Sequence, residues 1–205
     1  MKITERALLE LGYDVVSFRF DDEEWREATD YLMAIMANGP ALAMINEFEE
    51  EGETILLPLW KNGTILRAGY LKRSFINMMM KIQNHGRQLT QMRCLNQLKP
   101  LEFEKVLKKR TEFVYKISEK WQKQGLTAMV SPFWNHVAPK WSDVGDFGVA
   151  GEYSFIWNIT GFPCGIMPVT TVKADEQTFT DEYKDKYTKL FNSTCEGSEG
   201  LPVCI

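Results

Sequence analysis

Apolar residues recur at helical spacing in three parts of the chain, and two of these stretches end at a glycine. Residues 3–11 keep this spacing before Gly12, and residues 100–121 carry the longest apolar stripe before Gly125. Because glycine adopts the left-handed backbone of helix C-termini without steric cost, both glycines predict helix ends. A further helix is expected over residues 21–36.

Short β-branched and aromatic runs follow two of these helices. Residues 13–18 and 126–130 predict strands, so each helix, glycine and strand forms a unit typical of α/β proteins. Residues 166–172 and 201–205 predict two more strands, the first irregular because Pro168 cannot donate to a sheet. The pattern therefore predicts an α/β fold.

The remaining segments are less regular. Residues 55–80 interleave apolar and basic side chains and are interrupted by glycines, which indicates a short loop-and-helix element. Residues 132–151 are rich in proline and glycine and predict a loop, whereas residues 152–160 predict a short buried helix. Residues 173–200 are polar and are expected to form a surface excursion.

Composition narrows the functional classes. The chain has 205 residues, of which 44% are hydrophobic and 25% charged, so it can bury a core and is not a disordered scaffold. The net charge of −4 conceals a basic block, because residues 1–60 carry −10, residues 61–123 carry +11 and residues 124–205 carry −5. Such a block can meet nucleic acid, an anionic membrane or the chain's own acidic parts, or form a solvated helix surface.

Several chemistries lack support in the sequence. His85 and His136 lie far apart and no two of the four cysteines form a CxxC pair, so no metal site is expected. Motifs for phosphate or dinucleotide binding are absent, and no cofactor is expected. A pair of Cys164 and His136 has no local signature of a nucleophile, and Cys164 is more typical of a small buried residue. The basic block has no nucleic-acid-binding motif, so no nucleic acid partner is expected.

Two segments near the C-terminus resemble the amidase signature family. Residues 161–169, with the sequence GFPCGIMPV, resemble the family's element that enters one sheet strand, and residues 200–205, GLPVCI, resemble the element that enters the next. The helix ending at Gly125 and residues 5–18 resemble other parts of that fold. The resemblance implies a mixed β-sheet core covered by helices, with residues 1–205 as the C-terminal portion of a single domain, incomplete in this chain.

Within the family, the similarity is greatest to the fatty acid amide hydrolase branch. It involves residues 169–172, the aromatic-rich residues 153–158 and the apolar and basic residues 55–80. In that branch, the last of these segments forms a membrane-binding cap over the acyl channel. The resemblance implies membrane contact by Leu59, Trp60, Lys61, Arg67, Lys72 and Arg73. The alternative is an ordinary helix pair that packs on the domain.

The resemblance also implies the chemistry of the whole enzyme. Family members hydrolyse amides with a Ser-Ser-Lys mechanism, but this chain has no matching Gly- and Ser-rich signature. We therefore expect the catalytic residues to lie upstream, in a longer protein from which this chain is a truncated segment, and the chain alone to be inactive. Gly151, Phe155 and Ile156 precede the matched residues 161–163 and are expected to face the acyl channel; the alternative is that Phe155 and Trp157 are plain core aromatics.

The expected partners follow from this resemblance. The full-length protein would bind an acyl amide substrate and touch a membrane peripherally, which implies a cytoplasmic location or one at the surface of an internal membrane. Whether it forms a homodimer is left open by the sequence. The rival hypothesis is a non-catalytic module that binds a membrane surface or lipid.

Overall fold

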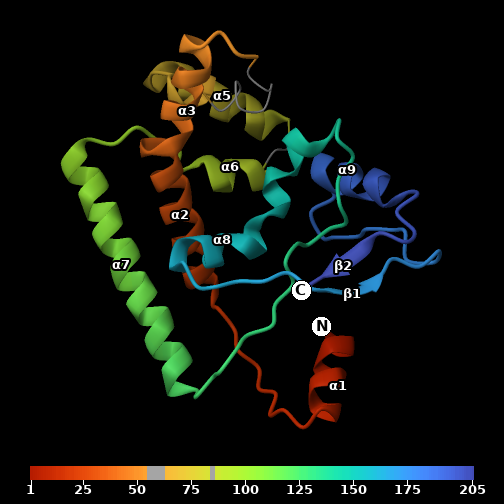
Figure 1. Cartoon of the computed structure of the whole chain (residues 1–205). Helices are drawn as coiled ribbons and strands as arrows, with labels where there is room; N and C mark the ends of the chain where they lie inside the picture. Colours follow the sequence, from red (N-terminus) through yellow and green to blue (C-terminus); the bar gives the residue numbers. More distant parts are fainter. Residues whose placement is uncertain (55–62, 84–85) are drawn as a thin grey trace.

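Helices dominate the described part of the chain, which comprises residues 1–54, 63–83 and 86–205 of the computed structural model. A single antiparallel pair of strands accompanies them within these ranges (Figure 1). In chain order the elements are α1 (Lys2–Glu10), α2 (Asp22–Asn38), α3 (Pro40–Glu50), α5 (Tyr70–Ile82), α6 (Gly86–Met92), α7 (Pro100–Lys123), η1 (Val144–Ala150), α8 (Glu152–Thr160), β1 (Pro168–Thr171), α9 (Lys186–Cys195) and β2 (Pro202–Cys204).

Local sequence explains where the main helices begin and end. Asp21 caps α2 by accepting a hydrogen bond from the Glu24 amide at 2.8 Å, and the Glu24 carboxylate accepts one from the Asp21 amide at 2.9 Å. This reciprocal capping box satisfies two amides that the helix leaves free. Gly12 and Gly125 follow α1 and α7 with φ angles of +83° and +63°, so both predicted helix ends are confirmed.

Helices α2, α7 and α8 form one packed group, here called the helical body. Figure 1 shows α7 alongside α2, with α8 near the N-terminal half of α2, and α2 contacts both other helices. Its core consists of Ala28, Phe113, Ile117, Ile156 and Ile159, all buried. The predicted short buried helix over 152–160 is thus confirmed as α8.

A second core, here called the aromatic cluster, lies at η1 and α9. Its buried members are Phe147, Tyr187 and Phe191, against which Trp134, Phe179 and Leu190 pack. The segment 173–200, expected to be a polar surface excursion, thus contributes two side chains to this core, and its description as an excursion stays a prediction. Because Tyr187 and Phe191 are four residues apart on a helix, both point to the same side, and α9 buries them despite its polar neighbours.

Two of the four predicted strands form in the described residues. Strands β1 and β2 lie within the predicted segments 166–172 and 201–205 and pair antiparallel, with an irregularity between Pro168 and Thr170. The predicted strands at 13–18 and 126–130 are wrong, because neither segment forms a ladder with another strand in the described residues. The mixed sheet implied by the family resemblance remains a prediction.

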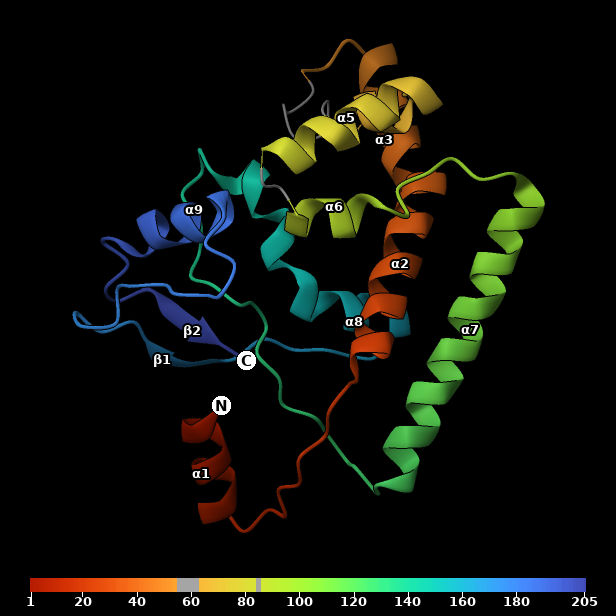
Figure 2. The ribbon, with the colours of Figure 1, turned by 180° about the vertical axis from the view of Figure 1, so that it is seen from behind.

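Strand propensity alone could not order residues 13–18. A strand is stable only when neighbouring strands pair with its backbone and cover its apolar face. Tyr13 and Val16 are instead exposed, and α1 stands apart from the other helices in both views (Figures 1 and 2). The end of the segment is held by contact of the Phe18 ring with Phe20 and Trp121.

Candidate functional site

A cavity of about 740 Å³ lies beside the aromatic cluster. It is enclosed by the segment after residue 132, by η1, by the chain that follows β1, by the end of α9 and by β2. Its lining residues are mainly apolar or aromatic: Phe133, Trp134, Asn135, His136, Val137, Ala138, Pro139, Val144, Phe147, Val172, Glu176, Thr178, Phe179, Cys195, Pro202, Val203 and Cys204.

Aromatic rings build the inner wall of this cavity. The His136 ring lies 5.3 Å from those of Phe147 and Phe179, measured between centroids, and 4.9 Å from that of Phe191. Val144 and Val203, which also line the cavity, are partly exposed to solvent. The cavity is thus an apolar hollow with an open side, which is the usual form of a small-molecule site.

His136 makes three polar contacts in the cavity wall. Its Nε2 lies 2.8 Å from the Phe191 carbonyl oxygen and 3.4 Å from the Cys195 sulfur, and its Nδ1 lies 3.1 Å from the Val137 carbonyl oxygen. The structure thus brings His136 to Cys195 rather than to Cys164, whose exposed thiol donates to the Phe162 carbonyl at 3.2 Å.

This geometry does not create an activated thiol. A carbonyl oxygen only accepts hydrogen bonds, so the tautomer that satisfies the shorter of the two carbonyl contacts carries its proton on His136 Nε2. That nitrogen then cannot remove the proton from Cys195. Burial also raises the pKa of the Cys195 thiol above its ordinary value, which favours the neutral form. His136 therefore holds the cavity wall in place through its hydrogen bonds. Within the described ranges, no three His, Cys, Asp or Glu side chains gather to hold a metal ion.

The three residues expected to face the acyl channel do not line this cavity. Ile156 is fully buried in the core of the helical body. Gly151 lies behind the wall, where a β-carbon would sit 3.2 Å from the Trp134 ring and 3.3 Å from that of Phe155. Glycine therefore lets Trp134 pack closely at this point. Their predicted role in substrate binding stays a prediction.

Six residues are expected to contact a membrane, and the structure describes three of them. Leu59, Trp60 and Lys61 lie outside the described residues. Arg67 donates to both Glu49 carboxylate oxygens, at 2.9 and 2.7 Å, which compensates its charge. Lys72 is exposed on α5. Arg73 instead has its guanidinium partly buried, in a small pocket described below.

Helix α5 presents an apolar stripe that sequence inspection did not single out. Its members are Leu71, Phe75, Met78 and Ile82, with 83%, 59%, 51% and 71% of their surfaces exposed. Their i, i+4, i+7, i+11 spacing places them on one helix face, and this spacing is the signal that could have identified them. All charged residues of α5 are basic. Within the described residues, no helix is both long enough and apolar enough to cross a bilayer.

Comparison with known proteins shows a partial similarity to an amide hydrolase. Fatty-acid amide hydrolase 1 of Sus scrofa is 34% identical over 84 residues, which cover 39% of this chain and 14% of that protein. No family model matches the chain. The chain thus matches only a small part of the relative's length. The similarity supports a relation between this part of the chain and an amide hydrolase.

Proposed function

We propose that the chain is part of an amide hydrolase that acts on acyl amides, and that the aromatic-walled cavity receives the acyl group. Two observations support this: the partial similarity to a fatty-acid amide hydrolase, and the volume and apolar lining of the cavity. The cavity observation carries the proposal. Its 740 Å³ lies within the range of about 300–1,000 Å³ of small-molecule sites.

Apolar burial would provide the affinity. Each methylene group transferred from water into such a cavity contributes about 0.8 kcal/mol, so longer acyl chains bind more tightly until the cavity is full. The proposal assigns catalysis to residues outside this chain, because the described side chains include no activated nucleophile of the family's type. The chain therefore binds the acyl group without turning the amide over.

A cavity-filling substitution tests this proposal. In Val203→Trp the indole occupies the cavity mouth, and the affinity for a fluorescent hexadecanoyl amide should fall about tenfold or more, as expected when a few methylene contacts are lost. Val16→Trp makes the same change at an exposed site away from the cavity and should bind like the original chain. Circular dichroism would show that both variants are folded.

Two results would overturn the proposal. One is equal binding of the acyl amide by Val203→Trp and the original chain. The other is affinity that does not increase from a hexanoyl to a hexadecanoyl amide. Hydrolysis of the amide by the 205-residue chain would separately refute the assignment of the catalytic groups to residues elsewhere.

A second candidate function, contact with a membrane surface, is favoured by the α5 stripe. Four exposed apolar side chains can enter the interface between headgroups and acyl chains, while Lys72 and Lys81 on the same helix attract anionic lipids. This contact suits either a peripheral amide hydrolase or a non-catalytic lipid-binding module. The two are separated by the acyl amide experiment above.

Sedimentation with lipid vesicles tests the membrane contact. The chain should sediment with vesicles of phosphatidylcholine and phosphatidylserine, and Phe75→Ser should sediment much less because it removes the centre of the stripe. The control Tyr115→Ser removes an equally exposed aromatic ring from α7, far from the stripe, and should sediment normally. Unchanged sedimentation of Phe75→Ser would refute the membrane contact.

A further inference from the structure

Arg73, near the start of α5, lacks an acidic partner among the described residues, unlike three other arginines. Arg67 pairs with Glu49, Arg93 with Asp30, and Arg87 with Asp181 and Asp185. In the parts of the chain that the structure describes, no Asp or Glu oxygen lies within 4.0 Å of the Arg73 guanidinium. Its positive charge is therefore not balanced by these residues.

The contacts of Arg73 satisfy only part of its hydrogen-bonding capacity. Nη2 donates to the Ile65 carbonyl oxygen at 3.0 Å, whereas Nε is buried and has no hydrogen-bond partner. Burial lowers the pKa of this guanidinium, which shows that its surroundings disfavour the charged form. A partly buried cation without a counterion is costly unless an anion joins it.

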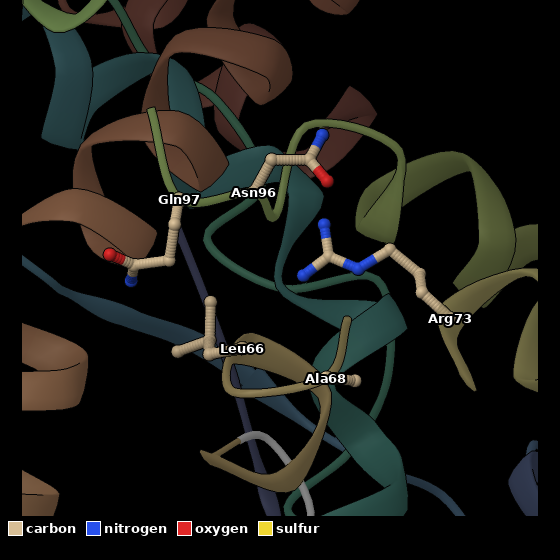
Figure 3. Close-up of a pocket in the computed structure, with 5 residues that line it drawn as sticks. All are labelled: Leu66, Ala68, Arg73, Asn96 and Gln97. Atoms are coloured by element: carbon tan, nitrogen blue, oxygen red, sulfur yellow. The ribbon is translucent and has the colours of Figure 1, made fainter. Parts of the chain in front are cut away.

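A pocket of about 240 Å³ opens beside this guanidinium. Figure 3 shows the guanidinium directed toward the Asn96 side chain, with Leu66, Ala68 and Gln97 around the remaining space. The pocket therefore combines one cation and the Asn96 carboxamide with an apolar wall, while the Gln97 carboxamide turns away toward Ala37. It is too small for the drug-sized ligands that occupy sites of about 300–1,000 Å³.

The wall opposite Arg73 is held in place before any ligand binds. Gln97 Nε2 donates to the Ala37 carbonyl at 2.8 Å, and Asn96 Nδ2 donates to the Arg93 carbonyl at 3.0 Å. Asn38 Nδ2 donates to the Asn96 carbonyl at 2.7 Å. These bonds fix the chain before α7 against the C-terminal end of α2, so the pocket is preorganised.

We propose that this pocket binds a small oxyanion, a carboxylate or a phosphate group, through the guanidinium of Arg73. The planar guanidinium presents parallel N–H groups that match two oxygens of such an anion. The oxyanion can be a free ion or the headgroup of an anionic lipid, because both present the same carboxylate or phosphate oxygens. The proposal does not depend on the acyl cavity, with which this pocket shares no residue.

Calorimetric titration with inorganic phosphate and with acetate tests the site, at constant ionic strength adjusted with chloride. The chain should bind at least one of these anions, and Arg73→Gln should weaken that binding about tenfold or more because a charge-assisted, paired contact is lost. Lys72→Gln removes the same charge from the neighbouring exposed position and should bind as the original chain does.

A second variant keeps the proposal testable if Arg73→Gln does not fold. Ala68→Asp places a carboxylate in the pocket, so it should raise the melting temperature and abolish the response to phosphate and acetate. Ala68→Asn has nearly the same shape without the charge and should not raise the melting temperature. Equal melting temperatures of these two variants would contradict the proposal.

The source of the oxyanion is distinguished with vesicles. If Arg73→Gln loses binding to vesicles containing phosphatidylserine while Lys105→Gln, which removes a charge from an exposed position on α7, keeps it, the anion is a lipid headgroup. If both variants bind vesicles equally and only Arg73→Gln loses the phosphate or acetate response, the anion is a free one. Binding of all three probes by Arg73→Gln as tightly as by the original chain would overturn the proposal.

Discussion

The helical body and the aromatic cluster use similar side chains in different ways. In the helical body, aromatic rings pack against one another and against aliphatic residues of three helices; the centroids of the Tyr31 and Phe113 rings, for example, lie 5.9 Å apart. In the aromatic cluster, the rings of Phe147, Phe179 and His136 stand around a cavity. The first arrangement fills the space between the helices, whereas the second leaves a cavity.

The two regions also differ in how charge joins their elements. Glu24 at the start of α2 pairs with Lys120 of α7 at 2.7 Å, and the lysine remains partly exposed. At the aromatic cluster, Arg87 of α6 binds Asp181 and Asp185 among aromatic rings, with its guanidinium 4.8 Å from the Tyr183 ring centroid. Removing one partner of this partly buried network should leave the other charge uncompensated, which costs more than the loss of an exposed pair.

The largest effect should come from the core of the helical body. Ile156→Ala removes a fully buried side chain and leaves a void, which should lower the free energy of unfolding by about 2–5 kcal/mol. Urea denaturation measures the loss. Because Ile156 packs in the helical body, the folded fraction should still bind the hexadecanoyl amide with unchanged affinity. If the folded Ile156→Ala variant bound the amide more weakly, Ile156 would instead belong to the acyl site.

The next effect concerns the ion pairs of the aromatic cluster. Asp185→Asn keeps the side-chain oxygen that caps α9 by accepting from the Tyr187 and Thr188 amides, but it removes a charge from beside Arg87. The free energy of unfolding should fall by about 1–3 kcal/mol. Chemical denaturation at neutral pH measures this loss, and stability equal to that of the original chain would show that Asp181 alone balances Arg87.

Acid should weaken the same region. Burial would raise the pKa of Asp185, but hydrogen bonds from Arg87 and the Thr188 amide outweigh it and lower the pKa to about 2. An unfolded aspartate has a pKa of about 3.9, so this contribution is complete above that pH and is lost as the pH falls toward 2. Urea denaturation between pH 5 and about 2.5 should show a smaller decline in Asp185→Asn. An equal decline would assign the acid sensitivity to other groups.

The smallest effect should come from an exposed ion pair that, like Arg87 and Asp185, joins an arginine to a carboxylate. Arg67→Gln breaks the contact with Glu49. The side chains of both residues are about two-fifths exposed. Solvent and salt weaken such pairs, so the free energy of unfolding should change by about 0–1 kcal/mol. Measurement at low and high salt should show most of the change at low salt. A loss as large as that of Asp185→Asn would mean that burial does not explain the difference between the two pairs.

Parts of the fold were predictable from the sequence because local interactions determine them. Apolar spacing identified the helix that ends before Gly125, and the conformational freedom of glycine fixed its end. The pair of strands at 168–171 and 202–204 was also expected from residue type. The predicted strands at 13–18 and 126–130 failed because strand formation depends on partners, which propensity does not reveal.

The candidate site was less predictable because distant residues form it. His136 and Cys195 are 59 positions apart, and neither has neighbours that signal the contact between them. The polar composition of residues 173–200 also hid the two aromatic residues that α9 buries. The α5 stripe could have been found from spacing alone, whereas its exposure depends on how α5 packs.

The sequence by itself determined the positions of the main helices, the glycines that end two of them, the basic block and the partial similarity to an amide hydrolase. Each of these depends on residue type or on spacing within a few turns. Only the tertiary structure decided that Ile156 fills a core, that aromatic rings enclose a cavity and that Arg73 lacks a carboxylate partner among the described residues. Burial and charge pairing arise from contacts between distant segments, and those exist only after the chain has folded.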